Sequence, residues 1–336
     1  MAKPVITIIG LGLTGAGIGA GLRREEGNFE VVGHDKEPDA VAAAKRQNAV
    51  DRTEWNLYRA CDKAEMIILA IPLAELEAIL KLLAADLRPG TLVMAVNKVM
   101  QPALDVAAKH IPDGVHFVAA HPILTGVGGT LTVRPDLFTG APFCLASSVE
   151  TDPSAIQLAS DLVERIGAKP LFIDAQEHDG IIAGVELLPQ FFGMTLMQTL
   201  GGGAGWTEAR KLAGRQFAQS TEPAGSADRL FSDFVANKRN LLLRIDQLQE
   251  ALSNWRGLLE EEIVPELQEE EHPLLTALKA TIKQREAWEA GAFLKNWEEA
   301  PRTDAAETRN MFQQMFFGNL FQRRGSAEEK NDKVAR

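Results

Sequence analysis

The 336-residue sequence is poor in cysteine, and its two cysteines stand apart. Cys61 and Cys144 form no C-x-x-C pair, which argues against a zinc site and a disulfide framework, so we expect no metal. Unpaired thiols fit a reducing compartment. The N-terminal residues also lack the basic segment and cleavage site of a signal peptide. We therefore expect a cytoplasmic protein.

The sequence also lacks an excess of basic residues and a long apolar run. Its 35 Lys and Arg against 46 Asp and Glu give a net charge of −11. Because an acidic surface repels phosphate backbones, we expect no nucleic-acid partner. We find no run of about 18 apolar residues and expect no membrane partner. The hydrophobic fraction of 46% is ordinary for a globular protein, and the length suggests about two domains.

The first half of the chain alternates short β-branched runs with segments of helical period. Strands separated by such helices predict βαβ units and a largely parallel sheet. Asp152, followed by Pro153, predicts the start of one of these helices. The runs that predict strands are PVITIIG, FEVVGHD, MIILAIP, GTLVMAV, HFVAAHP, PFCLAS and PLFID.

The second half of the chain contains no convincing strand. Three long stretches of helical character follow, at residues 177–200, 227–262 and 272–297. The first is apolar nearly all round, which predicts burial inside a domain or at a subunit interface. A break between helices is expected at the glycine cluster 201–203. The fold class predicted is therefore α/β followed by an all-α region.

These patterns divide the chain into three segments. We expect an α/β domain at residues 1–175 and a helical domain at residues 176–322. Residues 323–336 have too little apolar surface to offset the entropy of ordering and are predicted to form a disordered tail.

A glycine-rich turn follows the first predicted strand and opens a helix. Gly10 permits the tight turn, Gly12 lets the backbone approach a diphosphate, and Gly15 lets helix and strand pack closely. The diphosphate would lie at the positive end of the helix dipole. The expected cofactor-binding residues of this turn are Gly10, Leu11, Gly12, Leu13, Thr14 and Gly15. The pattern predicts a Rossmann-type dinucleotide site; a tight turn that binds nothing is the alternative.

An acidic residue stands where the adenosine ribose would lie. Asp35 ends the second predicted strand, 20 positions after Gly15, and a carboxylate there accepts hydrogen bonds from the ribose hydroxyls. It also repels a 2′-phosphate, which favours NAD. Lys36 follows directly and would soften that repulsion, so NADP stays open as the cofactor.

The order of motifs resembles the prephenate/arogenate dehydrogenase family of tyrosine biosynthesis. The motifs that carry the resemblance are GLGLTG, ILAIP at Ile68–Pro72, HFVAAHP at His116–Pro122, LFTGAPFCLAS, PLFIDAQEHD and VANKRNLL. The resemblance implies an NAD(P)-binding Rossmann domain at residues 1–175, a helical domain for dimerisation and substrate binding at residues 176–322, and a homodimer. It implies an NAD(P)-dependent oxidoreductase in which Ile71 and Pro72 help to bind the cofactor.

The resemblance also implies a reaction and two site residues. The reaction is oxidative decarboxylation of a cyclohexadienol, with hydride passing to nicotinamide. His121 would hydrogen-bond the substrate hydroxyl and take its proton; the alternative is a histidine that caps a loop. Arg215 would grip a carboxylate of a small anionic substrate; the alternative is a solvated arginine at a helix end, with Arg210 and Lys211 close by.

The sequence departs from the family pattern around the expected substrate pocket. Lys98 stands where the family has a serine, and Val127 stands where it often has a glutamate. The family motif S-H-L-P-H is replaced by Glu186-Leu187-Leu188-Pro189-Gln190, so both of its histidines are absent. We expect Lys98 either to act in catalysis and hold a substrate carboxylate or to reach solvent. An unpaired buried carboxylate is costly, so Glu186 is expected to pair with Lys98 or a substrate amine, or with neither.

Three functions therefore stay open. The first is a dehydrogenase of the prephenate/arogenate type with an altered pocket. The second is an enzyme of the same scaffold that acts on another small hydroxy, keto or imino acid. The third is a protein that senses NAD(H) without turnover.

Overall fold

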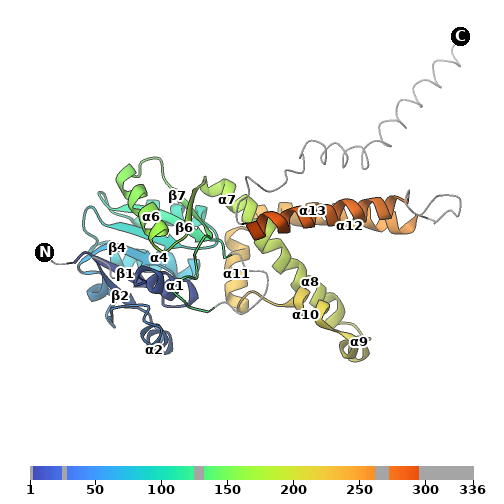
Figure 1. Ribbon diagram of the computed structural model, residues 1–336, viewed down its shortest axis with the longest axis horizontal. Coiled ribbons are helices and arrows are strands. Elements are labelled where there is room, and N and C mark those ends of the chain that lie inside the picture. The colour runs from blue at the N-terminus through green and yellow to red at the C-terminus, as the bar shows by residue number, and fades with distance from the viewer. Residues whose placement is uncertain (1–2, 25–28, 125–131, 262–271, 295–336) are drawn as a thin grey trace, which may run out of the picture. The chain divides into compact units, whose positions relative to one another are not determined.

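The computed structural model describes residues 3–24, 29–124, 132–261 and 272–294. The chain divides into two compact units, residues 1–251 and 252–336. The first unit contains one eight-stranded sheet and the helices that follow it (Figure 1). In the second, α12 ends at Glu260 and α13 covers Pro273–Leu294. The predicted tail at 323–336 lies outside the described residues.

The sheet has the strand order β3-β2-β1-β4-β5-β6-β7-β8. All neighbouring pairs are parallel except β6 and β7, which run antiparallel. The first six positions follow the order 3-2-1-4-5-6 that is typical of dinucleotide-binding sheets. The strands are β1 Val5–Ile9, β2 Glu30–His34, β3 Arg52–Thr53, β4 Ala64–Leu69, β5 Leu92–Val96, β6 His116–Pro122, β7 Pro142–Ser147 and β8 Lys169–Phe172.

Among the described residues, six helices lie between strands and eight helical segments follow the last strand. The first six are α1 Leu13–Leu22, α2 Pro38–Arg46, α3 Leu57–Cys61, α4 Leu73–Leu83, α5 Gln101–His110 and α6 Pro153–Arg165. The later ones are α7 Ala175–Ile182, the π-helix η1 Ala183–Leu187, α8 Leu188–Gly201, α9 Trp206–Leu212, α10 Arg215–Thr221, α11 Ala227–Ala236, α12 Lys238–Glu260 and α13.

The core lies on both faces of the sheet. Alternate residues of a strand point to opposite faces, and Ile67 and Ile68 of β4 accordingly belong to two different clusters of buried side chains. Ile68 shares its cluster with Ile18 of α1, and Ile67 shares the other cluster with Leu76 of α4. Near-continuous apolar strands are expected of a sheet covered on both faces.

The structure confirms the predicted fold class. All seven predicted strands are present, and Asp152 caps α6 by accepting a hydrogen bond from the backbone of Ser154. The two-residue strand β3 was not predicted, because it is too short to show a pattern. The predicted helix at 227–262 is interrupted at Asn237, whose side-chain amide donates to the backbone carbonyl of Asp179 at 2.7 Å.

One expectation about hydropathy needs correction. The 27 residues Ala175–Gly201 form a helical run long and apolar enough to cross a membrane by length and composition, with a mean hydropathy of 1.4 over the best window. The sequence pattern did not predict it, because charged residues such as Glu186 interrupt the apolar run. A single such helix is weak support for a membrane span, since helices packed in protein pass the same test.

Candidate active site

The glycine-rich turn has the backbone that the sequence predicts. Gly10 has a φ of +93°, a conformation that side-chain-bearing residues rarely adopt. A Cβ on Gly15 would collide with the backbone oxygen of Gly10, so helix α1 approaches the turn as closely as glycine allows. At Gly12, by contrast, a Cβ would meet no atom within 4 Å. The open side of the turn is therefore at Gly12, where a diphosphate would approach.

The acidic residue after β2 faces this turn. Asp35 accepts hydrogen bonds from the backbone N–H groups of Leu11 at 2.6 Å and Glu37 at 2.8 Å. Its neighbour Lys36 is paired with Glu75 of α4, with Nζ 2.7 Å from Oε1. The pair with Glu75 raises the pKa of Lys36. Asp35 is thus fixed beside the turn, while Lys36 is held by another carboxylate.

Two features, at the start of α1 and at Asn97, fit a bound dinucleotide. Helix α1 begins without a side-chain cap, so its first N–H groups are free to meet a diphosphate. Asn97 after β5 donates from Nδ2 to the backbone oxygen of Ile71 at 2.9 Å. Its buried Oδ1 has no hydrogen-bond partner among the described residues. A buried acceptor without a partner is costly and fits a donor on a bound ligand.

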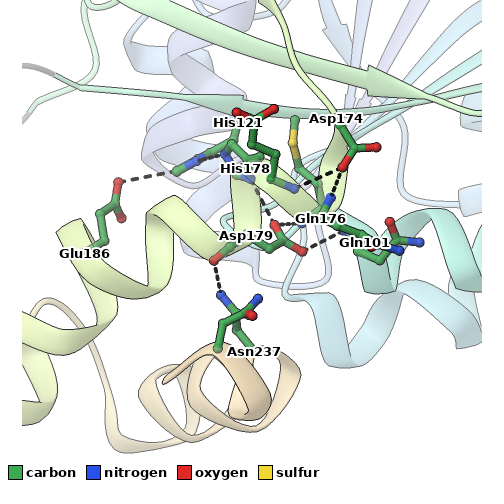
Figure 2. Close-up of polar contacts among 11 residues, drawn as sticks. Gln101, His121, Asp174, Gln176, His178, Asp179, Glu186 and Asn237 are labelled. Carbon is green, nitrogen blue, oxygen red and sulfur yellow. Dashed lines mark hydrogen bonds and ion pairs between the residues drawn. The ribbon is translucent and has the colours of Figure 1, made fainter. Parts of the chain in front are cut away.

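His121 lies near the end of β6, at the edge of the sheet toward the helical segment. Its Nδ1 is 3.1 Å from Nε2 of His178, and Nδ1 of His178 is 2.9 Å from Oδ1 of Asp179 (Figure 2). On the other side of the ring, Nε2 of His121 faces Oε1 of Glu186 at 3.8 Å. All but Glu186 are buried: His121 is 7% exposed and His178 2%. Figure 2 shows them as one row from Glu186 to Asp179.

Asp179 anchors this row to the surrounding backbone. Its Oδ1 accepts from the N–H of Met100 at 2.8 Å, and its Oδ2 accepts from the N–H of Gln101 at 2.9 Å. These two residues begin α5, so the carboxylate lies at the positive end of that helix. Asn237 binds the backbone carbonyl of Asp179. α7 is therefore fixed to both α5 and the start of α12.

A cluster of charged side chains lies on the Nε2 side of His121. Lys98, which follows β5, has its Nζ 3.2 Å from Oε2 of Glu186 and 3.7 Å from Oδ2 of Asp233 on α11. The pairing of Lys98 with Glu186 is one of the arrangements expected from the sequence. Glu186 belongs to the π-helix η1, and such insertions in an α-helix often re-aim side chains at functional sites.

The surroundings of His121 keep its ring neutral. Burial, followed by the neighbouring His178 and Lys98, lowers its pKa to about 3, while Asp179 opposes the shift. Burial also raises the pKa of Asp233, against the effect of Lys98 and Arg229. At neutral pH the imidazole therefore has one nitrogen with a hydrogen and one with a free lone pair.

The structure brings some of the predicted residues together and leaves others apart. His121, Lys98 and Glu186 share one cluster, whereas Arg215 is exposed at the start of α10. No hydrogen bond or ion pair joins Arg215 to this cluster within the described ranges. Arg229 of α11 interacts electrostatically with both His121 and Asp233. Val127 lies outside the described residues.

Sequence reasoning missed several members of the cluster. His178 and Asp179 stand in the motif DAQEHD, and a histidine followed by an acid at the start of a helix is a signal that could have pointed to them. Asp233 and Arg229 lie on an ordinary amphipathic helix and carry no local signal. Only the unpartnered side-chain oxygen of Asn97 in the structure indicates that this residue belongs to a binding site.

Comparisons with known proteins find matches for both the sheet region and the helical region of the chain. The family models "Prephenate dehydrogenase, nucleotide-binding domain" and "Prephenate dehydrogenase, dimerization domain" match residues 18–171 and 174–271. A prephenate dehydrogenase of Bacillus subtilis is 24% identical over 77% of this chain and 71% of its own length. One of Lactococcus lactis is 30% identical over 57% of this chain and about half, 52%, of its own length. The crystal structure of prephenate dehydrogenase from A. aeolicus with hydroxyphenyl propionate and NAD+ has a TM-score of 0.74 at 21% identity, covering 85% of this chain and 98% of that one.

Proposed function

The chain belongs to the prephenate dehydrogenase family, and we propose that it is an NAD-dependent dehydrogenase that oxidises and decarboxylates a cyclohexadienol acid of the prephenate or arogenate type. The observation that carries this proposal is the placement of His121. A buried, neutral imidazole lies at the ligand-binding edge of a dinucleotide-binding sheet, with its Nε2 turned toward a cluster of charged side chains.

His121 is the base of the proposed reaction. NAD, when bound, supplies the hydride acceptor for the ring carbon that carries the hydroxyl group. As hydride leaves, that hydroxyl becomes the O–H of a protonated carbonyl, which is a strong acid. A base of low pKa is therefore sufficient, and His121 Nε2 takes the proton. The carboxylate of Glu186 stabilises the resulting imidazolium across 3.8 Å. Loss of carbon dioxide then sends the electron pair of the broken C–C bond through the ring to the carbonyl oxygen, which makes the ring aromatic, and the phenolate takes the proton back from His121.

Positive side chains on this side of the site are suited to a small anionic substrate. Lys98 already lies between Glu186 and Asp233, so we propose that it holds a substrate carboxylate only if it exchanges one of these partners. Arg229 is exposed beside the same cluster and offers the planar fork that binds carboxylates. Arg215 stays a candidate for this role through the family resemblance, and Glu186 stays a candidate for a substrate amine.

The nucleotide turn favours NAD over NADP. Asp35 beside Leu11 repels a 2′-phosphate, and the cation next to it, Lys36, is paired with Glu75. Gly10, Gly12 and Gly15 shape the diphosphate site, with Leu13 and Thr14 at the start of α1. Ile71 and Pro72 follow β4, at the same edge of the sheet.

A dimer explains the apolar surface of the helical segment. The matching dimerization-domain model covers residues 174–271. Large apolar side chains are exposed on the helices from α7 to the first half of α12: Ile181, Val185, Phe192, Leu200, Leu212, Phe231, Val235, Leu242 and Leu243. Exposed apolar surface of this extent marks an interaction site. We propose that a second copy of the chain covers it in the cytoplasm, and that 1–175 and 176–322 are the two functional domains.

The proposed activity is tested by turnover assays with prephenate and with arogenate, each with NAD and NADP. Replacement of His121 by Asn should lower kcat by about a thousandfold, because general base catalysis is lost. His116→Asn is the matched control, since His116 lies at the opposite end of the same strand. Equal activity of the His121 variant would remove this residue from the mechanism.

A second candidate function follows from the altered pocket. Lys98 and Glu186 form an ion pair at two positions where the family pattern has serines, which suits a substrate with both charges. The same assay with other small hydroxy, keto and imino acids tests this. Tight NADH binding without turnover of any acid would favour an NAD(H)-sensing protein instead.

A further inference from the structure

We propose that His178 and Asp179 are positioning residues, which fix the hydrogen of His121 on Nδ1 and so leave the lone pair of Nε2 facing the substrate. This proposal rests on the proposed role of His121 as the base. It is carried by the order of donors and acceptors along the buried row from the start of α5 to η1 (Figure 2).

The row begins at the carboxylate of Asp179, which can only accept hydrogen bonds. The backbone N–H groups of Met100 and Gln101 point at the two oxygens of Asp179. Since a backbone N–H only donates, the side chain of Asp179 is held as a carboxylate acceptor. The ring nitrogen 2.9 Å from Oδ1, Nδ1 of His178, therefore carries a hydrogen.

For a neutral His178 the direction of each following hydrogen bond is then determined. A neutral imidazole has one donor and one acceptor, so with Nδ1 of His178 protonated its Nε2 accepts. The partner of that Nε2 at 3.1 Å is Nδ1 of His121, which must donate. Nε2 of His121 is left with the lone pair that a general base needs.

Glu186 would favour the opposite tautomer, with the hydrogen on Nε2 of His121, but it lies too far away to accept that hydrogen. Its Oε1 lies 3.8 Å from Nε2 of His121, beyond hydrogen-bond distance, and its Oε2 is engaged by Lys98. The groups that face His121 from the surrounding elements are His178, Asp179, Lys98, Glu186, Cys144 and Arg229, and Asp233 lies against Lys98. Of these, His178 alone is within hydrogen-bond distance of the ring among the described residues.

The same row stabilises the charge that forms during the reaction. When the substrate proton arrives at Nε2 of His121, the hydrogen on Nδ1 stays in place and its bond to His178 becomes charge-assisted. The positive charge is then shared toward the carboxylate of Asp179, much as the acid of a catalytic triad supports its histidine. Loss of this support should therefore lower kcat more than it alters KM.

The tautomer is measured directly by nitrogen NMR of the full-length protein labelled with ¹⁵N-histidine. The chain has six histidines, and the signals absent from the His121→Asn variant identify those of His121. We expect hydrogen on Nδ1 and none on Nε2 in the wild-type protein. A hydrogen on Nε2 would overturn the proposal. This measurement needs no substrate, and it needs no variant at position 178.

Two amide variants separate positioning from simple space-filling. The amide of Asn branches at Cγ and matches Nδ1 of histidine, whereas the amide of Gln lies one atom farther and matches Nε2. His178→Gln therefore keeps an acceptor for His121, and His178→Asn keeps only the donor to Asp179. We expect kcat within about fivefold of wild type for Gln and a loss of about fiftyfold for Asn, with KM changed by less than about threefold.

The outcomes distinguish this proposal from the proposed function. His121 should move to the Nε2–H form in His178→Asn and stay in the Nδ1–H form in His178→Gln, with thermal melting used to confirm that both fold. Equal kcat for the two variants, or a higher kcat for His178→Asn, would show that His178 serves only as a hydrogen-bond donor to Asp179. Absence of turnover with both acids would instead count against the proposed function, whatever the tautomer.

Discussion

The sheet region and the helical region of residues 3–251 bury their apolar side chains in different ways. Both faces of the sheet are covered by helices of the same chain, and strand residues such as Ile68 and Leu69 are fully buried. In the helical region the buried cluster consists of Ile182, Leu187 and Leu241, with partly buried neighbours. The sheet region is therefore stabilised by packing against helices of its own chain. The helical region needs a partner surface to bury its exposed apolar side chains.

The active-site cluster draws on both regions. His121 and Lys98 come from the ends of sheet strands, whereas His178, Glu186 and Asp233 come from helices. We expect changes in the sheet region to affect stability and cofactor binding, and changes in the helical region to affect association. The following substitutions test this contrast, beginning with the largest expected effect.

The glycines of the cofactor turn should separate stability from binding within the sheet region. Gly15→Ala pushes a methyl group against the backbone of Gly10, so we expect a loss of about 3 kcal/mol in the free energy of unfolding. Gly12→Ala meets no atom, so stability should be kept while NAD affinity falls roughly tenfold. Denaturant unfolding and calorimetric titration with NAD measure both quantities. Equal stability losses in the two variants would contradict this interpretation of the turn.

A matched pair of exposed apolar residues tests the contrast in association. Leu243 on α12 is 55% exposed and Trp55, in the sheet region, is 82% exposed. If a second copy covers the helical face, Leu243→Glu should raise the dimer dissociation constant by about a hundredfold, since a buried charge without a partner is costly. Trp55→Glu should leave it unchanged. Analytical ultracentrifugation of both variants measures the dimer dissociation constant. A wild-type protein that is monomeric at micromolar concentration would refute the dimer itself.

The contrast also explains which features could be predicted from the sequence. The turn at Gly10–Gly15 and the position of Asp35 follow local rules, because a diphosphate site is built from consecutive residues. The row through His178 and Asp179 joins residues far apart in the chain. Its hydrogen-bond directions depend on the backbone N–H groups of Met100 and Gln101, which any residue except proline could supply. The break at Asn237 likewise depends on a distant carbonyl. Arg215, which was placed by motif alignment, stays a prediction, and Arg229 beside the cluster carries no motif that could have pointed to it.

The smallest expected effect lies in cofactor choice, entirely within the sheet region. Glu75→Gln would release Lys36 from its ion pair and let it neutralise a 2′-phosphate, so NADP affinity should rise about threefold while NAD affinity stays the same. Glu77→Gln is the matched control, because it removes the same charge from α4 but from a residue paired with Lys81 and His110. Fluorescence titration with both reduced cofactors measures the effect. An equal gain in the two variants would assign it to net charge, and Lys36 would then have no part in the choice between NAD and NADP.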